Sequence, residues 1–583
     1  MKENLRLFAF WVVAFASAAG LQAQGTGEIS VENNVVMKAR DGVGLRADVY
    51  RPKREGKFPV ILERTPYDKR MGAGFGVKAA AQGYVYVVQD VRGRNASEGD
   101  WYPFKYESQD GYDAVEWAAA LPYANGKVGL FGGSYVGATQ LLAAMAAPPH
   151  LAGIMPYVTA SNYYEHWVYQ GGAFSLLVDQ AWSSALALDT LQRRVAKSIQ
   201  PRVEDWKQSP ADFPLFELGS TAGLADYYFN WLLHPAYDDY WKQWAIEEHF
   251  SQIQVPSLHI AAWYDLFQDG SIRNYTGIKA SGGNEAARKG QRLIILTGGH
   301  AGAGPKIGEV DFGKDSVLDL QAIGLRWYDF LLKGINNGMG SEKPVKIFVM
   351  GKNVWRDEED WPLARAKATR FYLHSGGNAN SLQGDGVLRT ESPGTEPADQ
   401  YVYDPADPVP THGGPILGDP VHFPPGPLDQ RPVENRSDVL IYTTTPFLKD
   451  TEVTGPIGLE LYISSSAIDT DFTGKVVDVW PNGFAQNLSD GILRARYRNS
   501  REKPEFMNPG EIYKLNINLW STSTVFLANH RLRLEVTSSN FPRFDRNLNT
   551  GASPETTTRQ VKATQKIYHD TSHASSLMVP IVP

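Results

Sequence analysis

The chain has 583 residues, 43% of them hydrophobic, and a formal net charge of -7 from 57 basic and 64 acidic side chains. A single hydrophobic core normally stops growing near roughly 250–300 residues, so two or three domains are expected. The balanced charge, without a long run of either sign, argues against nucleic acid as a partner. The sequence contains no cysteine, which excludes disulfides, thiolate chemistry and Cys-ligated zinc.

The first residues have the pattern of a secretory leader. Lys2 and Arg6 precede an apolar stretch from about Leu7 to Ala19, which is shorter than the ~20 residues of a membrane span. Small residues follow, and cleavage after Ala23 is favoured over cleavage after Ala18. We therefore predict a signal peptide over residues 1–23, a periplasmic or secreted mature chain, and no stable membrane anchor. The alternative for this segment is a buried N-terminal helix.

The next part of the chain predicts a mainly parallel sheet. Two alternating strands meet at Asp41-Gly42, a favoured hairpin dipeptide. Strongly apolar runs then alternate with helix-like stretches, as in sheets that are covered by helices on both faces. These apolar runs are residues 58–63, 84–90, 127–132, 152–158, 256–265 and 292–300.

Composition divides the mature chain into further regions. Residues 30–160 and 252–366 carry the α/β pattern, whereas residues 161–251 are rich in aromatic residues and favour helices, which predicts a cap inserted between two strands. From about residue 367 to residue 583, short alternating strands are separated by Gly, Pro, Asn and Asp, which predicts an all-β sandwich or jelly roll. The Pro-rich stretch over residues 404–427 is predicted to be a long loop.

Ser134 lies in the segment GGSYVG, Gly132–Gly137, between a predicted strand and a predicted helix. A nucleophile at such a sharp turn needs glycine neighbours, and the helix N-terminus places a positive dipole end near any oxyanion. Val136 occupies the second position after the serine, where the usual G-x-S-x-G pattern has glycine. By itself the segment is compatible with a nucleophile or with a plain glycine-rich turn.

A serine becomes a good nucleophile only when a base takes its proton and an acid orients that base. In sheets of this type the order along the chain is Ser, then Asp or Glu, then His, each just after a strand. Asp265 and His300 meet both conditions. The competing candidates are Asp269, which suits a helix start, His259, which lies inside a strand, and His569 and His573, which belong to the β-rich tail.

Several motifs together resemble one family. These are GGSYVG, TPYDK at residues 65–69, QDVRGRNASEG at 89–99, WYD at 263–265 and SSNFPRFDRN at 538–547. They resemble the cocaine esterase (CocE/NonD) family of α/β-hydrolases, which is related to X-Pro dipeptidyl-peptidases and α-amino acid ester hydrolases. The resemblance runs from about residue 36 to the C-terminus. It implies an α/β-hydrolase fold with a helical cap insertion, followed by an all-β jelly-roll domain.

The resemblance also implies roles for particular residues. Ser134 would be the nucleophile, His300 the general base and then acid, and Asp265 the carboxylate that orients it. The oxyanion would accept hydrogen bonds from the Tyr67 hydroxyl and the backbone N–H of Tyr135. One departure is that the histidine stands in TGGHAGAG, where many relatives carry a tryptophan shortly before it.

The substrate pocket is expected between the edge of the sheet and the cap. Its candidate lining residues are Tyr163, Tyr164, Trp167 and Phe267, which together suggest a bulky apolar or aromatic acyl group. The alternative is that these aromatic side chains mainly hold the helices of the cap together.

Carboxylic ester hydrolysis through an acyl-enzyme is the function that we predict first. Relatives specific for amino esters carry acidic residues after the orienting aspartate, where this chain has Leu266 and Phe267, and Glu165 stands alone. The alternatives are an X-Pro dipeptidyl-peptidase, an amide or β-lactam side-chain acylase, and a non-catalytic carbohydrate-binding protein. We expect no cofactor and no metal. The expected substrate is a small ester, an amide or a short peptide. The sequence leaves open whether the chain forms a homo-oligomer.

Overall fold

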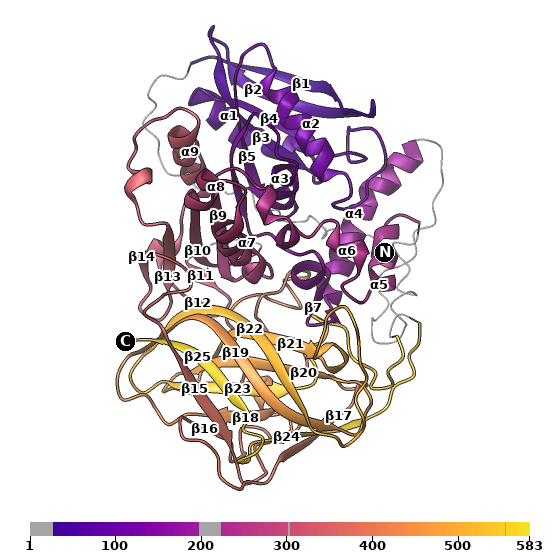
Figure 1. The fold of residues 1–583 in the computed structure, drawn as a ribbon, viewed down its shortest axis with the longest axis vertical. Helices are drawn as coiled ribbons and strands as arrows, with labels where there is room; N and C mark the ends of the chain where they lie inside the picture. Colours follow the sequence, from indigo (N-terminus) through magenta and orange to yellow (C-terminus); the bar gives the residue numbers. More distant parts are fainter. Residues whose placement is uncertain (1–26, 197–222, 301–303, 554–555) are drawn as a thin grey trace, which may run out of the picture.

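The computed structural model describes residues 27–196, 223–300, 304–553 and 556–583. An α/β domain forms one end of the molecule and an all-β domain forms the other, in agreement with the predicted fold class (Figure 1). The predicted signal peptide lies outside the described residues, so it stays a prediction. Within the described ranges, no helix is long and apolar enough to cross a membrane.

The α/β domain is built on one ten-stranded sheet in the order β1-β2-β4-β3-β5-β6-β9-β10-β13-β14. The strands from β4 to β13 in this order run parallel, while β1, β2 and β14 pair antiparallel at the two edges. The bounds are β1 (Ile29–Lys38), β2 (Gly44–Pro52), β3 (Phe58–Thr65), β4 (Val85–Asp90), β5 (Ala124–Gly133), β6 (Leu151–Tyr157), β9 (Ser257–Tyr264), β10 (Gln291–Gly299), β13 (Val345–Val349) and β14 (Val354–Glu358).

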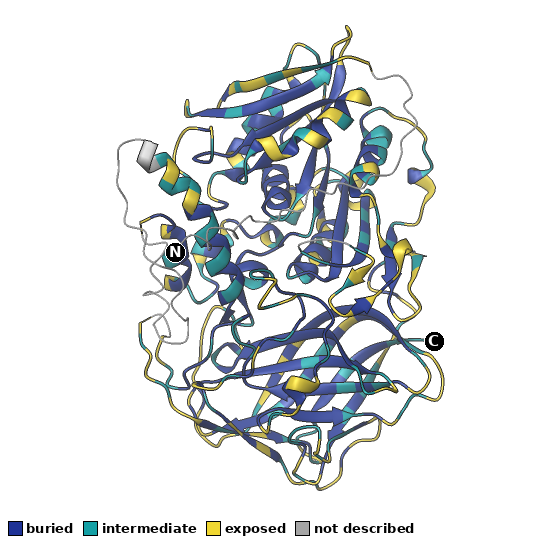
Figure 2. Ribbon diagram, turned by 180° about the vertical axis from the view of Figure 1, so that it is seen from behind, coloured by how far each residue is buried: buried dark blue, intermediate teal, exposed yellow. Residues whose placement is uncertain are grey.

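Helices cover both faces of this sheet, as the continuously apolar strands predict. On β3, Val60 and Leu62 face one hydrophobic cluster and Ile61 faces another, because successive side chains alternate between the faces. The first cluster contains α2 (Glu107–Ala119) and α3 (Tyr135–Met145), and the second contains α1 (Ala73–Ala81) and α9 (Leu320–Leu331). Figure 2 shows the resulting buried interior of the strands between helices with exposed outer sides.

The predicted cap region lies between β6 and β9 in sequence. It opens with a π-helical turn, η2 (Tyr164–Val168), and a two-stranded ladder of β7 (Tyr169–Gln170) and β8 (Ala173–Phe174), features that the sequence did not predict. The helices α4 (Leu176–Ala196), α5 (Asp226–Leu233) and α6 (Asp239–Lys242) follow. Stacked aromatic rings, such as those of Trp182 and Trp231, hold α4 against α5.

The C-terminal domain is built mainly from β-strands, with a short helix, α10 (Arg431–Glu434), between β17 and β18. Its sheet has the order β17-β24-β19-β25-β15-β16-β18-β23-β20-β21, and β22 pairs with β19. The predicted loop over residues 404–427 contributes only isolated bridges, including Pro410 with Phe541. The bounds are β15 (Lys367–His374), β16 (Val387–Arg389), β17 (Asp399–Tyr403), β18 (Leu440–Thr443), β19 (Thr451–Ser465), β20 (Asp471–Val479), β21 (Ala485–Arg494), β22 (Tyr513–Phe526), β23 (Arg531–Thr537), β24 (Ala563–Tyr568) and β25 (Ser576–Val582).

A buried ion cluster joins the all-β domain to the start of the cap region. Arg494 donates to both oxygens of Asp471 at 3.0 Å and to Asp545 Oδ1 at 2.9 Å. The same Asp545 oxygen accepts from the backbone N–H of Phe174 at 2.8 Å. All three charged side chains are at most 7% exposed, so the two carboxylates depend on Arg494 to balance their charge away from water.

Replacing Arg494 with methionine should therefore destabilise the all-β domain strongly. The change leaves two buried carboxylates without their cation, a situation that costs about 3–5 kcal/mol in comparable buried pairs. Differential scanning calorimetry should show a lower unfolding temperature for Arg494→Met. The control is Arg389→Met on the exposed side of β16. Equal unfolding temperatures for the two variants would contradict a stabilising role for the cluster.

Candidate active site

Ser134 occupies a strained turn between β5 and α3. Its backbone has φ 60° and ψ -128°, a conformation that non-glycine residues rarely adopt. The Ser134 N–H donates to the carbonyl of Tyr157 on the neighbouring strand at 2.9 Å, which holds the turn in place. Strain of this kind presents a side chain above the end of a sheet, as nucleophile turns do in α/β-hydrolases.

The neighbouring glycines are required by close packing. A Cβ atom on Gly132 would lie 2.1 Å from Val136 Cγ1, and one on Gly133 would lie 2.1 Å from Tyr157 Cε2. On the helix side, a Cβ on Gly137 would lie 2.9 Å from Thr159 Cβ. The spacing of the motif thus follows from contacts of the turn with α3 and β6, even though valine stands where the usual pattern has glycine.

The structure brings Ser134, His300 and Asp265 together in one hydrogen-bonded chain. His300 Nε2 lies 2.9 Å from Ser134 Oγ, and His300 Nδ1 lies 2.8 Å from Asp265 Oδ2. Asp265 follows β9 and His300 follows β10, two adjacent parallel strands whose carboxyl ends reach the same edge of the sheet as β5. In the sequence His300 lies 166 positions after Ser134 and 35 positions after Asp265, so it is the sheet that makes these residues neighbours.

The carboxylate of Asp265 is held rigidly and away from solvent. Its side chain is 0% exposed, and its second oxygen accepts from the Phe267 N–H at 2.6 Å. The ring of Phe267 meets the imidazole of His300 edge-on, with centroids 5.1 Å apart. Asp265 and Phe267 therefore fix both the orientation and the surroundings of the histidine.

Tyr67 lies in the loop after β3, with its hydroxyl near the serine. The indole N–H of Trp182 on α4 donates to the Tyr67 hydroxyl at 3.0 Å. Burial raises the pKa of Tyr67, and hydrogen bonds with Trp182 and Ser134 offset part of that rise. The phenol is therefore neutral near pH 7, and its proton is available to an acceptor beside Ser134.

The backbone N–H and the side chain of Tyr135 lie in different surroundings. Its N–H is at the first position of α3, where backbone donors have no acceptor within the helix. Its side chain is buried away from the turn: the hydroxyl donates to Glu107 Oε1 at 3.0 Å and accepts from the Phe104 N–H at 2.8 Å. Only the backbone N–H of Tyr135 is thus placed for an oxyanion.

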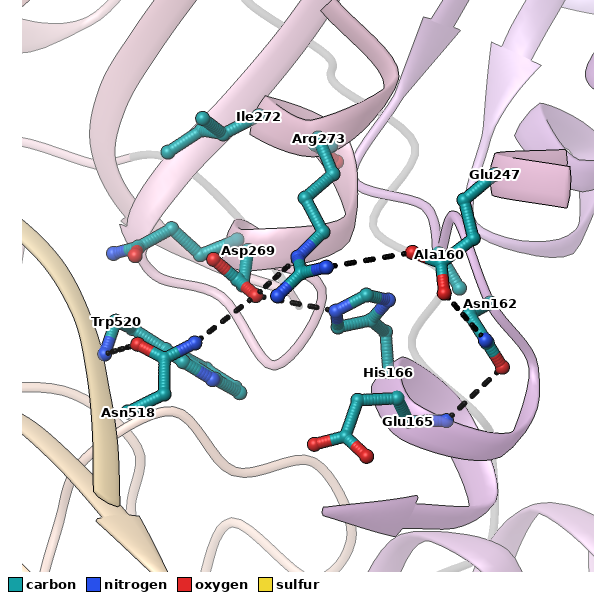
Figure 3. Close-up of polar contacts among 12 residues, drawn as sticks. Ala160, Asn162, Glu165, His166, Glu247, Asp269, Ile272, Arg273, Asn518 and Trp520 are labelled. Carbon is teal, nitrogen blue, oxygen red and sulfur yellow. Dashed lines mark hydrogen bonds and ion pairs between the residues drawn. The ribbon is translucent and has the colours of Figure 1, made fainter. Parts of the chain in front are cut away.

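The competing acid Asp269 belongs to a different cluster, shown in Figure 3. It lies in α7 (Gln268–Ser281), where one of its oxygens is 3.1 Å from His166 Nε2 and 3.0 Å from Arg273 Nε. Burial acts to raise the pKa of Asp269, but the hydrogen bond and charge of His166, together with Arg273, lower it to about 2. Asp269 is therefore an ionised partner of these two residues, and Asp265 is the carboxylate bonded to His300.

The competing histidines have structural partners elsewhere. His259 lies within β9, where Nε2 is 2.8 Å from Gln291 Oε1, and burial lowers its pKa to about 4. His569, in the all-β domain, contacts Asp399 and Glu396. His573 pairs with Asp570.

A small cavity of about 20 Å³ lies where the start of the cap region meets the all-β domain. Of the four predicted pocket residues, Trp167 is part of its lining. Tyr163 stacks on Phe104 of the α/β domain with centroids 3.8 Å apart, and Tyr164 stacks on Tyr169 within the cap region at 4.9 Å, so both rings take part in core packing. The ring of Phe267 lies between Trp167 and His300.

Sequence reasoning missed several residues around this site. Trp182 positions the Tyr67 hydroxyl, while Gln170, Arg543 and the loop segment 415–417 line the cavity. The motif that contains Arg543 was recognised, but its contact with Gln170 spans 373 positions and leaves no local pattern. Among the described residues, no group of three or more His, Cys, Asp or Glu side chains is arranged to hold a metal ion.

Comparisons with known proteins agree with this architecture. A family model described as X-Pro dipeptidyl-peptidase (S15 family) matches residues 41–302, and one described as X-Pro dipeptidyl-peptidase C-terminal non-catalytic domain matches residues 337–578. A cocaine esterase from a Rhodococcus species is 36% identical over 581 residues, which cover 95% of this chain and 99% of the relative.

Two solved structures share the fold over the whole chain. An aminopeptidase from a marine sediment archaeon of the Thaumarchaeota has a TM-score of 0.82 at 23% identity. The match covers 99% of this chain and 100% of the aminopeptidase chain. An α-amino acid ester hydrolase has a TM-score of 0.81, also at 23% identity, and covers 98% of this chain and 100% of its own. At this identity the two structures support the fold.

Fold and relatives together define a serine hydrolase of the α/β-hydrolase class. More particularly, the chain belongs to the cocaine esterase family, and it matches both the S15 family model and the model of the C-terminal non-catalytic domain. The resemblance inferred from the sequence motifs is thereby confirmed.

Replacing Gly133 with alanine should disrupt the turn, because the added methyl group would overlap the ring of Tyr157. Overpacking of this kind costs about 1–3 kcal/mol, so the unfolding temperature of Gly133→Ala should fall. The control is Gly74→Ala in α1, where a Cβ atom has no neighbour within 4 Å. If Gly133→Ala were as stable as the control, the ring of Tyr157 would not restrict the size of the residue at position 133.

Proposed function

We propose that the protein hydrolyses carboxylic esters, with Ser134, His300 and Asp265 as its catalytic triad. The observation that carries this proposal is the hydrogen-bonded chain from Ser134 Oγ to His300 to Asp265, at 2.9 and 2.8 Å. The serine lies on a strained turn and the aspartate is fully buried, which is the arrangement that such chemistry requires.

The reaction follows from these positions. Asp265 accepts a hydrogen bond from Nδ1–H of His300, which keeps the proton on Nδ1 and leaves Nε2 unprotonated, so that Nε2 can take the proton of Ser134 as the oxygen attacks the ester carbonyl. The imidazolium then donates this proton to the alcohol oxygen of the ester as the bond between that oxygen and the carbonyl carbon breaks. The alcohol departs, and the acyl group stays bound to Ser134. Water, deprotonated by His300, attacks the acyl-enzyme and releases the acid, with Ser134 regaining its proton.

Two donors are placed to stabilise the tetrahedral intermediate. The Tyr67 hydroxyl and the Tyr135 backbone N–H flank Ser134, and both can donate to the negatively charged oxygen that forms on the former carbonyl. The indole N–H of Trp182 donates to the Tyr67 oxygen and so holds that oxygen in position beside Ser134. Trp182 therefore acts as a positioning residue for Tyr67.

Ester substrates are favoured over substrates with a free amino terminus. The residues after Asp265 are Leu266 and Phe267, neither of which can pair with an ammonium group, and Phe267 packs against His300. Glu165 is one carboxyl group in the nearby cavity. The cocaine esterase relative supports ester hydrolysis, while the S15 family match makes X-Pro dipeptidyl-peptidase activity the second candidate.

Tyr67→Phe should reduce the rate of hydrolysis while the protein stays folded. Loss of one oxyanion donor typically lowers kcat by about 10²- to 10³-fold, and phenylalanine keeps the ring in place. Steady-state kinetics with p-nitrophenyl butanoate measure the effect, and Tyr112→Phe on the outer side of α2 is the matched control. A Tyr67→Phe variant with wild-type kcat would show that the phenol does not contact the oxyanion.

The choice between esterase and peptidase can be measured directly. We expect the wild-type protein to hydrolyse p-nitrophenyl esters and to leave an X-Pro-p-nitroanilide essentially uncleaved, because Leu266 and Phe267, which follow Asp265, cannot pair with the charged amino terminus of such a peptide. Ser134→Ala should lose all turnover. Faster release of p-nitroaniline than of p-nitrophenol from matched substrates would instead identify a dipeptidyl-peptidase.

A further inference from the structure

The segment QDVRGRNASEG contains the end of β4 and the loop that follows it, residues 91–99, hereafter the 91–99 loop. Its Arg94 is buried, with 2% of the residue exposed. Burial of a guanidinium is costly unless its N–H groups find oxygen acceptors inside the protein. The acceptors of Arg94 therefore identify which parts of the chain this buried charge holds together.

Arg94 joins two carbonyl groups from distant parts of the chain. Its Nε donates to the carbonyl of Pro66 at 3.0 Å, and its Nη1 donates to the carbonyl of Leu186 at 2.9 Å. Pro66 directly precedes Tyr67 in the chain. Leu186 lies in α4, one helical turn after Trp182. One guanidinium thus holds the backbone beside the proposed oxyanion donor against the helix that supplies the indole partner of that donor.

A second set of contacts leads from Arg94 to the same indole. The guanidinium of Arg94 lies over the ring of Trp101, 4.8 Å from its centroid. The ring of Trp101 packs against that of Trp182, with centroids 5.7 Å apart. Because the Trp182 N–H donates to the Tyr67 hydroxyl at 3.0 Å, Arg94 supports Tyr67 both through the backbone and through these rings.

The charge of Arg94 also acts on the phenol. Burial lowers the pKa of Arg94, and the carboxylate of Asp189 on α4, 3.5 Å from Nη1, offsets part of that change. An arginine stays protonated near pH 7 even so. Burial raises the pKa of Tyr67, and the positive charge of Arg94 is among the interactions that lower it again. The cation therefore makes the phenol a better donor to a developing negative charge.

We propose that Arg94 is a positioning residue that keeps the Tyr67 hydroxyl beside Ser134 while the oxyanion forms. The two carbonyl bonds of Arg94 fix the loop before the tyrosine relative to α4, so the phenol and its indole partner keep their separation. A misplacement of about 1 Å can lower a rate by about 10²-fold. This proposal rests on the proposed ester hydrolase function and adds to it a residue that contacts neither the ester nor the triad.

Arg193 on α4 provides a matched control. It donates to the carbonyls of Asn95, Ser97 and Gly99 at 3.2, 2.8 and 3.2 Å. Arg193 and Arg94 thus both connect α4 with the 91–99 loop. Among the described residues the acceptors of Arg193 lie in that loop, whereas Arg94 reaches the backbone beside Tyr67. A comparison of the two arginines separates positioning of the phenol from docking of the helix in general.

The kinetic test is a double-mutant cycle with p-nitrophenyl butanoate. Arg94→Met should lower kcat about 10- to 10²-fold and change KM less than about 2-fold, because the misplaced donor acts only in the transition state. In the Tyr67→Phe background the same change should lower kcat less than about 2-fold, because the donor is already absent. Arg193→Met should have the same effect on kcat in both backgrounds.

Arg94→Lys provides a second variant, which also decides the question if Arg94→Met does not fold. Its ammonium keeps the charge but lacks the planar fork that bonds to both carbonyls. We expect a smaller loss of kcat than in Arg94→Met, again confined to the background with Tyr67 intact. The proposal is overturned if Arg94→Lys has wild-type kcat, if Arg94 variants lose the same factor in both backgrounds, or if Arg193→Met depends on Tyr67 as strongly.

A measurement without turnover separates this proposal from the proposed function. Fluorine NMR would follow 3-fluorotyrosine introduced only at position 67 of Ser134→Ala. The resonance should shift or broaden in Arg94→Met and stay unchanged in Arg193→Met. If the protein hydrolyses no ester but this resonance depends on Arg94, the proposed function fails and the positioning of Tyr67 stands. If it hydrolyses esters and the resonance is the same in Arg94→Met, the positioning role fails and the proposed function stands.

Discussion

The strained turn at Ser134 is the constraint on which the rest of the site depends. A serine at φ 60° is stable there because its N–H is bonded to Tyr157 and because Gly132 and Gly133 leave no side chain to collide with α3 and β6. The turn raises the hydroxyl above the sheet edge, where adjacent parallel strands deliver Asp265 and His300. The packing of the sheet thus maintains the geometry that the chemistry needs.

The site is completed by segments outside the α/β domain. The cap region contributes Trp182, which orients the Tyr67 hydroxyl, and Trp167, which forms part of the cavity wall. The all-β domain contributes Arg543 and residues 415–417, and its buried Arg494 cluster ties it to β8. The positions of these groups in space therefore require both domains to be folded and docked, so the surroundings of Ser134 depend on the whole chain.

Local sequence patterns predicted the α/β sheet and the three residues that the structure joins by hydrogen bonds, Ser134, His300 and Asp265. Ser134, Asp265 and His300 each follow a continuously apolar strand, and this pattern depends on neighbours in sequence alone. The pattern did not predict β13 and β14, which are short, or β7 and β8, which have two residues each. It also could not reveal that Asp269 pairs with His166 or that Gln170 meets Arg543, because these contacts are made by the tertiary fold over 103 and 373 positions.

Labelling by a fluorophosphonate tests whether Ser134 is an activated nucleophile, because this reagent reacts with activated serines and needs no knowledge of the natural substrate. Intact-mass spectrometry of the wild-type protein and of Ser134→Ala would measure the extent of reaction. If Ser134 is the nucleophile, we expect one adduct per chain in the wild type and none in Ser134→Ala. A folded wild-type protein that does not react, or an adduct that persists in Ser134→Ala, would show that Ser134 is not an activated nucleophile.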